Sequence, residues 1–477
     1  MLNSIRPNKA GSSIFSASFA APKKPLFTPA GIIIFIVVMA VWTLAIVWMI
    51  KGGDTPATFA RITDVVSTYG RGPLVEAAAY ALEKYGRPVV LVRTGQSVAG
   101  DYPADDAHGG TVSGTSTVTV DDAGTEPDDD YECYFVVVAG GTIGTAGITF
   151  QWSLDGGRTL SPVTALGTAN SFVFPDSGGI AIDFGAGTLL AGDTVTFRAD
   201  APNWNATEVG TALDALFAAI INWEICHVVG PIDGTTFDTI DPKFTGALAS
   251  GKYRSWVGHT RMPNLSETEA AYKTALDGIF SAKATVHGEL CAGAAKTSSG
   301  VSGRSYRRPI SFAVAPRQQS VQEHINIAAI NVGSLPGISI RDANGNPDEH
   351  DESINPGLDD SRFTVLRTWE GYQGIYVNRS RIFSAAGSDF DLHTKRRVIN
   401  LAHAALRSYF TRRLNQPILV DADSGFILEQ EAREIEAGAR AALRSVLGSA
   451  PKASGWTVAI SRTDNLLSTK TLTGSAR

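Results

Sequence analysis

The stretch GRGPLVEAAAYALEKYGRPVVLVR, residues 70–93, decides the fold class of this chain. Pro73 stands in the first turn of a predicted helix, whose apolar side chains recur at helical spacing up to Leu82, and Gly86 ends it. An apolar strand, residues 88–93, follows at once. A helix that leads directly into a buried strand is typical of an α/β layer. The stretch therefore predicts an α/β core.

The pattern changes over residues 104–204. Residues 116–120 alternate polar and apolar side chains, and residues 134–138 form a short run of aromatic and β-branched side chains. Asp-Gly, Gly-Gly and Ser-Gly turns separate such runs. This is typical of an all-β sandwich or small barrel. The helix-and-strand pattern then resumes over residues 205–360. We therefore predict an all-β domain inserted into an α/β core whose first part is residues 55–103.

A C-terminal α+β domain is predicted over residues 361–454. It contains two long helices, residues 391–413 and 429–447, whose apolar positions recur at helical spacing. On the second helix, Glu436 and Arg440 form an i,i+4 pair that we place on the solvent face.

The structured chain ends in one more predicted strand, after which only a Ser/Thr-rich tail is expected. A terminal strand without a later strand to pair with needs a partner edge from elsewhere. We therefore interpret residues 455–477 as a C-terminal arm, and residues 1–54 as an N-terminal arm with a hydrophobic segment. The residues expected to make the inter-subunit contact are Trp456, Thr457, Val458, Ala459, Ile460 and Ser461.

Basic side chains on the first long C-terminal helix form a second candidate site. They lie largely away from its apolar stripe, and no aromatic residues interleave with them. They are interpreted either as a solvated helix face or as a face that pairs with an acidic surface of another copy, such as residues 121–122 or 128–130, and so sets register. These basic residues are Lys395, Arg396, Arg397, Arg407, Arg412 and Arg413.

Composition excludes several classes of protein. The 477 residues suffice for about three domains of ~150 residues each. With Lys+Arg 41 against Asp+Glu 47, the net charge of −6 supplies no broad positive field for nucleic acid. Cys133, Cys226 and Cys291 are odd in number and have no metal-ligand spacing, so neither a disulfide framework nor a zinc site is predicted.

No motif for catalysis or nucleotide binding stands in the sequence. GxxxxGK[ST], a GxGxxG turn and a GxSxG elbow in a strand-turn-helix setting are all missing, and the eight histidines are scattered. The acidic run DEHDE, residues 348–352, lacks the spacing of a calcium loop and is interpreted as a solvated loop. A Ser-His-Asp triad built from distant residues stays open. We predict no enzyme, no metal and no cofactor.

Residues 32–50 form a dense apolar run interrupted only by Thr43, and Lys51 follows it. The length matches the roughly 20 residues that cross a hydrocarbon core, so a transmembrane helix is one interpretation. Residues 32–38 are almost entirely β-branched, which is equally typical of strands buried on both faces. Both interpretations stay open.

Three segments together resemble the contractile tail sheath proteins of phages and related injection systems. The first is residues 70–93. The second begins at Ala191 with AGDTVTF and ends in ALDAL at residue 216. The third begins at Gly374 with GIYVNRSR and includes both long C-terminal helices. The likeness covers most of residues 55–460, and it rests on the order and spacing of the segments together.

The resemblance implies a structural subunit without cofactor. Such a subunit polymerises as a helical tube around an inner tail tube and contracts to drive that tube through the host envelope. Its implied partners are further copies of itself, the tail tube protein, and baseplate and tail terminator proteins, but no nucleic acid. Its implied location is the virion tail, assembled in the host cytoplasm. Terminal arms would link neighbours by strand addition, with residues 12–19 as the incoming arm.

The run at residues 32–50 departs from the family's pattern, because sheath proteins have no hydrophobic segment this dense. If the run spans a membrane, the protein is tethered there and the assignment of residues 12–19 as an arm is in doubt. The alternative function is a membrane-anchored surface or injection-apparatus protein with a ligand-binding β-domain.

Overall fold

The structure is a computed structural model with mixed α/β architecture, several small antiparallel sheets and one parallel sheet. The chain divides into two compact units, each described below by itself. Unit 1 comprises Met1–Gly52, Phe244–Ser255 and Thr394–Arg477, and unit 2 comprises Gly53–Lys243 and Trp256–His393. The residues that the structure describes are 13–14, 55–102, 109–121, 126–265, 267–342, 344–448 and 452–476.

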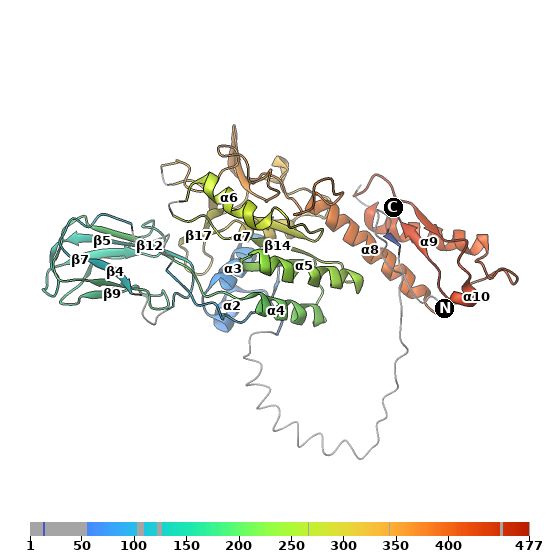
Figure 1. Ribbon diagram of the computed structural model, residues 1–477, viewed down its shortest axis with the longest axis horizontal. Coiled ribbons are helices and arrows are strands. Elements are labelled where there is room, and N and C mark those ends of the chain that lie inside the picture. The colour runs from blue at the N-terminus through green and yellow to red at the C-terminus, as the bar shows by residue number, and fades with distance from the viewer. Residues whose placement is uncertain are drawn as a thin grey trace, which may run out of the picture. The chain divides into compact units, whose positions relative to one another are not determined.

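The deciding stretch forms the predicted helix followed by a strand, in unit 2 (Figure 1), but this strand is mostly half-buried and is not part of the sheet that contains the parallel strands. Helix α3 (Pro73–Tyr85) has proline at its first position, and Gly86 ends it in the left-handed conformation at φ +64°. Strand β3 (Val89–Leu91) follows and pairs antiparallel with β2 (Ala57–Phe59). Helix α2 (Ile62–Tyr69) packs against α3.

A three-stranded sheet in the order β13-β14-β15 forms the centre of the α/β layer, and β14 and β15 run parallel. Gly288 of β15 lies opposite Trp256 of β14, and a side chain at Gly288 would overlap the buried Trp256 ring. The strands are β13 (Ile225–Pro231), β14 (Ser255–His259) and β15 (Gly288–Cys291). The accompanying helices are α4 (Ala206–Ala218), α5 (Gly234–Ala249), α6 (Glu269–Phe280) and α7 (Ser311–Ser320), and the last residues of α5, 244–249, are counted with unit 1.

Smaller sheets complete this part of unit 2. One has the order β17-β16-β18 and the other is the hairpin β19-β20. Their strands are β16 (Ala294–Ser298), β17 (Ser305–Pro309), β18 (Ile338–Ser339), β19 (Leu366–Trp369) and β20 (Tyr372–Val377), and a 3-10 turn, η3 (Ile330–Val332), lies between β17 and β18 in the chain.

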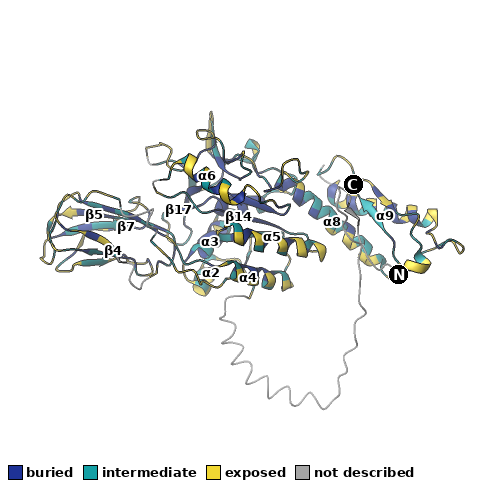
Figure 2. Cartoon of the chain, in the orientation of Figure 1, coloured by how far each residue is buried: buried dark blue, intermediate teal, exposed yellow. Residues whose placement is uncertain are grey.

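The predicted strand-rich segment forms antiparallel sheets, and buried and less buried residues occur along the same strands (Figure 2). Its interior is one cluster rich in aromatic side chains. Every second side chain of β5 is buried up to Val137, and Phe135 stacks on Phe150 of β7 at 4.5 Å between ring centroids. The four-stranded sheet, in the order β12-β5-β7-β8, contains β5 (Tyr131–Ala139), β7 (Thr149–Ser153), β8 (Thr164–Ala165) and β12 (Thr194–Ala199). The others contain β4 (Val118–Asp121), β9 (Ser171–Val173) and β10 (Ala181–Phe184), and β6 (Gly141–Thr142) with β11 (Thr188–Leu189).

Unit 1 contains the two predicted long helices, α8 (His393–Arg413), whose first residue still belongs to unit 2, and α9 (Glu429–Leu447). Leu406 of α8 and the buried stripe of α9, which includes Ala439 and Leu443, belong to one apolar cluster, as their helical spacing predicts. A short helix, α10 (Leu466–Thr469), lies nearer the C-terminus.

Residues 32–50 lie outside the described residues, and neither interpretation of that run is tested. Among the described residues, no helix combines the length and apolarity that a membrane span requires.

Candidate assembly site

Both ends of the chain enter one three-stranded antiparallel sheet in unit 1, in the order β1-β22-β21. Its strands are β1 (Ser13–Ile14), β22 (Gly474–Ala476) and β21 (Val458–Ile460). We call this sheet the terminal sheet. Its central strand, β22, pairs Ala476 with Ser13 on one side and with Val458 on the other.

The expectation that no later strand pairs with residues 456–461 is wrong. β21 pairs along its length with β22, and the Ser461 amide donates to the Thr473 carbonyl at 2.8 Å. The sequence hid β22 because its three residues, Gly-Ser-Ala, have neither β-branching nor alternation. The glycine has a packing role, since a Cβ at Gly474 would lie 2.9 Å from Ile460 Cδ1. The role of residues 456–461 as an inter-subunit arm stays a prediction.

Charged side chains bind the edge of β21 that faces away from β22. The Ile460 amide donates to Glu436 Oε1 at 2.9 Å, and Arg440 Nη2 donates to the Val458 carbonyl at 3.1 Å. Arg462 Nη1 donates to the Ile460 carbonyl at 2.6 Å and also to Glu436. The Glu436–Arg440 pair was expected to face solvent, but Glu436 is only 7% exposed because its carboxylate serves this strand edge.

In the same cluster, the positive charge of Arg462 lies beside the negative charges of Glu429 and Glu436. Arg462 Nε donates to Glu429 Oε2 at 2.9 Å, and hydrogen bonds from Arg462 and Arg433 lower the pKa of Glu429 to about 2. The hydrogen bond from Arg462 also holds the pKa of Glu436 below its usual value. Both carboxylates are therefore ionised at neutral pH, and two carboxylates of α9 share one guanidinium beside β21.

The structure divides the predicted basic face of α8. Lys395, Arg407 and Arg412 are exposed, whereas Arg396 and Arg397 are buried. The basic side chains therefore do not form one solvent-facing surface. Charge pairing with another copy stays a prediction for the three exposed residues.

Arg413, the last residue of the predicted basic face, has partners within its own chain. Its Nη2 lies 3.3 Å from Glu431 Oε1, and its Nη1 donates to the Tyr409 hydroxyl at 3.0 Å. That hydroxyl donates to the Ile435 carbonyl at 3.1 Å. Arg413 therefore ties α8 to α9.

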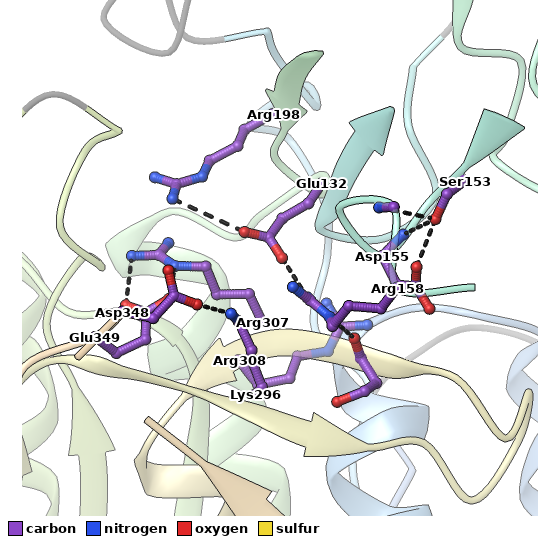
Figure 3. A network of polar contacts seen from close by, with 12 residues as sticks. Glu132, Ser153, Asp155, Arg158, Arg198, Lys296, Arg307, Arg308, Asp348 and Glu349 are labelled. Carbon is purple, nitrogen blue, oxygen red and sulfur yellow. Dashed lines mark hydrogen bonds and ion pairs between the residues drawn. The ribbon is translucent and has the colours of Figure 1, made fainter. Parts of the chain in front are cut away.

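A polar network inside unit 2 fastens the strand-rich segment to β17 (Figure 3). Arg158 donates to Glu132, and its Nε donates to the Ser305 carbonyl at 3.2 Å. Arg198 lies 3.9 Å from the same glutamate. Tyr306 of β17 belongs to the aromatic core of the strand-rich segment. Polar and apolar contacts thus join the same two elements.

Two adjacent arginines of β17 carry the buried part of this network. Arg308 Nη2 donates to Asp129 Oδ2 at 2.6 Å, and Arg308 Nη1 donates to the Asp130 carbonyl at 2.8 Å. Arg307 holds Glu349 through two hydrogen bonds of 2.5 and 3.1 Å. Both arginines and their carboxylate partners are buried, so each charge depends on its partner.

One interpretation of the basic face required residues 128–130 to be an acidic surface that another copy could bind. The structure shows instead that these residues have partners within their own chain. Asp129 is buried against Arg308. Asp128 accepts a hydrogen bond of 2.6 Å from the Tyr131 hydroxyl, and Asp130 accepts one of 2.8 Å from the Ala201 amide.

The acidic run at residues 348–352 is not a solvated loop. His350 lies between Glu269 and Glu352, at 2.8 and 2.9 Å, and is buried. Burial lowers the pKa of His350, but the hydrogen bonds to the two glutamates outweigh it and raise the pKa to about 9. Asp351 accepts a hydrogen bond of 2.6 Å from the Thr368 hydroxyl. In the described part of the chain, no group of three or more His, Cys, Asp or Glu could hold a metal ion.

One buried serine lies between two histidines. Ser311 Oγ is 2.9 Å from His227 Nε2 and 2.9 Å from His259 Nδ1. Burial lowers the pKa of each imidazole to about 3. Among the described residues, no carboxylate is hydrogen-bonded to either histidine, so this cluster lacks the orienting acid of a catalytic triad.

A cavity of about 820 Å³ lies in unit 2, lined by parts of α3, β3, α4 and β13. It therefore belongs mainly to the α/β layer, whereas aromatic side chains fill the interior of the strand-rich segment. Cys133 and Cys291 are buried, Cys226 is half-buried, and all three are free thiols.

Fold and site together describe a mixed α/β protein whose most distinctive feature is a sheet made from both chain ends. The family model described as the N-terminal domain of DUF2586 matches residues 47–381. The chain therefore belongs to the DUF2586 family. No curated protein matches it.

Solved structures of tail sheath proteins match over most of the chain. The sheath tail protein of Listeria innocua is 12% identical, with a TM-score of 0.42, over 86% of this chain and 85% of its own. The sheath tail protein of Desulfitobacterium hafniense is 13% identical, with a TM-score of 0.41, over 85% and 86%. The anti-feeding prophage helical sheath in its contracted state is 13% identical, with a TM-score of 0.37, over 58% and 72%.

Proposed function

We propose that the chain is the structural subunit of a contractile tail sheath. Copies polymerise as a helical tube around an inner tail tube and contract to drive that tube through a host envelope. The work of contraction comes from the difference between two packings of the same subunit interfaces, so the chain itself carries out no reaction.

The terminal sheet is the observation that carries this proposal. Its central strand, β22, lies next to β1 from the opposite end of the chain. A strand near a chain terminus can join an equivalent sheet of a neighbouring copy by the same main-chain hydrogen bonds. Repeated from copy to copy, such strand addition gives a continuous linkage that survives sliding of the subunits.

The remaining parts have mechanical roles in this proposal. Residues 55–103 and 205–360 form an α/β core, residues 104–204 form an inserted β-domain that faces outward, and residues 361–454 form the assembly domain. The buried pairs Arg307–Glu349 and Arg308–Asp129 support a rigid junction at the base of the β-domain. The β-domain would then move with the core during contraction.

The partners in this proposal are further copies of the chain, the tail tube protein, and baseplate and tail terminator proteins. The location is the virion tail, assembled in the host cytoplasm. One of the matched solved structures is an anti-feeding prophage baseplate.

Deletion of residues 455–477 tests the proposal, because it removes β21 and β22 and leaves unit 2 intact. We expect the full chain to form tubes and the truncated chain to remain folded but unassembled, by electron microscopy and circular dichroism. A full chain with the exposed Lys470→Ala substitution is the matched control and should form tubes. Tubes formed by the truncated chain would refute the role of the terminal sheet.

A further inference from the structure

We propose that free copies of this chain pair through an exposed apolar face of unit 1, which the same face of a second copy covers. The hairpin at residues 419–428 and helix α10 form this face. We call it the hairpin face, and its exposed apolar members are Leu419, Phe426, Leu428 and Leu467. This inference goes beyond the proposed function. A two-fold pair closes on itself, whereas a helical tube is built from head-to-tail contacts, so the pair belongs to copies that have not joined a tube.

The register of the hairpin fixes which side chains share a face. Residues 419–421 run antiparallel to residues 426–428, with Val420 opposite Ile427 and two main-chain hydrogen bonds of 2.9 and 3.1 Å. Opposite residues of such a pair share a face, and neighbours along each strand alternate between the two faces. Ile427 is buried in an apolar cluster of unit 1, so its face is turned inward. The outward face carries Leu419, Asp421, Phe426 and Leu428.

Both faces of the hairpin are therefore largely apolar. Leu419 is 63% exposed, and Leu467 of α10 is 59% exposed. In the described part of unit 1, the four apolar members of the hairpin face are the large apolar side chains that are exposed. An antiparallel pair at a protein surface ordinarily turns polar side chains to water, and a gathered group of exposed apolar side chains marks an interaction surface.

Hydrogen bonds hold the hairpin face in shape without a partner. The Leu466 amide of α10 donates to the Gly425 carbonyl at 2.8 Å, and Asn465 Nδ2 donates to the Ser424 carbonyl at 2.9 Å. The Ser424 hydroxyl donates to Asp421 Oδ1 at 2.7 Å. A second copy would therefore meet a preformed surface, and binding would not have to order the loop first.

Charges at the two ends of the hairpin make the face complementary to itself. Asp421 and Asp423 are exposed at its tip. Residues 414–418 connect its base to the end of α8, where exposed Arg412 accepts a hydrogen bond of 3.1 Å from Gln416 at its main-chain carbonyl. Two copies packed in opposite directions place the acidic tip of each beside the basic base of the other. Packed in the same direction, the two tips would meet and their like charges would repel.

Sedimentation velocity of the full-length chain tests the pairing, measured on the fraction that stays soluble after any tubes are pelleted. We expect dimers of the unsubstituted chain at low micromolar concentrations. Leu419→Ser with Leu428→Ser should raise the dissociation constant of the dimer about tenfold or more, because the contact then buries two fewer leucine side chains. Val163→Ser with Val173→Ser, at exposed positions of the strand-rich segment, is the matched control and should leave the constant unchanged.

Charge exchange tests the two-fold arrangement at exposed positions, and it remains informative if the leucine variants unfold. Asp423→Arg alone and Arg412→Asp alone should each raise the dissociation constant by about fivefold, because each places like charges together. The variant with both substitutions should return close to the unsubstituted value, since tip and base are again opposite in charge. Glu370→Arg, at an exposed position of unit 2, should have no effect.

A monomeric unsubstituted chain would overturn the inference and assign the hairpin face to a different protein. Unchanged dissociation constants in the leucine variant or in the single charge variants would overturn it as well, as would a combined charge variant no tighter than the single ones. Tubes from a chain that is otherwise monomeric would overturn the inference and leave the proposed function standing. Dimers that respond as expected but never form tubes would support the inference and count against the sheath function.

Discussion

The backbone amide of Ile460 donates a hydrogen bond of 2.9 Å to the carboxylate of Glu436, and this bond joins strand β21 to helix α9. The bond lies at the strand edge that has no strand partner among the described residues. Arg462 donates to the same carboxylate, so a single buried glutamate serves both the strand and its charge cluster. The stability of the terminal sheet should therefore depend strongly on Glu436.

Glu436→Ala should lower the free energy of unfolding of unit 1 by about 1–3 kcal/mol, because it leaves the Ile460 amide without its acceptor. Unfolding in guanidinium chloride measures the change in the free energy of unfolding. Hydrogen exchange at the Ile460 amide should become faster in this variant. Glu434→Ala is the matched control on the exposed side of α9 and should stay within about 0.5 kcal/mol of the unsubstituted chain. Equal effects of the two substitutions would contradict the role given to Glu436.

Arg308→Met should destabilise unit 2 by about 3–5 kcal/mol, because the buried Asp129 carboxyl then loses its charged hydrogen-bond partner. The double variant Arg308→Met with Asp129→Leu should recover a large part of this loss. The exposed pair Arg71–Asp176, at 3.0 Å, is the control, and Arg71→Ala should cost at most about 1 kcal/mol. Urea unfolding of these three variants and of the unsubstituted chain measures the differences, and a double variant less stable than Arg308→Met would refute the role given to the pair.

Acid should destabilise the protein through His227 and His259. Burial lowers the pKa of each to about 3 in the folded chain, whereas unfolded histidine binds a proton near pH 6.5. The unfolded state binds more protons between these values, so stability falls as pH decreases through this window, by about 1.4 kcal/mol per pH unit for each histidine. His227→Gln should therefore flatten the dependence of the urea midpoint on pH between 6 and 4. An unchanged slope would contradict the assignment.

His350 should act in the opposite direction at high pH. Its pKa is raised to about 9, so the stability contributed by its charged form is fully present below about pH 6.5 and is lost as pH rises through 9. The melting temperature of the unsubstituted chain should fall more between pH 7 and 9.5 than that of His350→Gln. The same pH dependence in both proteins would refute a protonated His350 between Glu269 and Glu352.

Regular periodicity in the sequence predicted the elements that have it. α3, α9 and the alternating strand β5 occur where the apolar spacing places them. Helix α5 has Pro242 in its interior, and α7 has Pro316, so neither has a regular helical pattern and neither was predicted. Strand β22 is Gly-Ser-Ala and is recognised only by its pairing in three dimensions.

The candidate site was less accessible from sequence than the fold. The sequence pointed to residues 456–461, but the importance of Glu436 and Arg462 depends on a contact between α9 and a strand that follows it in the chain. The predicted basic face was also only partly correct. Arg396 and Arg397 are neighbours of exposed basic residues in the sequence, but both are buried in the fold. Charge and spacing alone do not reveal which face of a polar helix is covered by distant residues.

Electron cryomicroscopy of the purified full-length chain tests whether copies join into a tube through the terminal sheet. We expect hollow helical tubes in which each terminal sheet contains β21 and β22 of one copy and a strand from another copy beside β22. Particles that remain single chains at concentrations of tens of micromolar, or tubes whose subunits meet without any strand exchange at the terminal sheet, would contradict it.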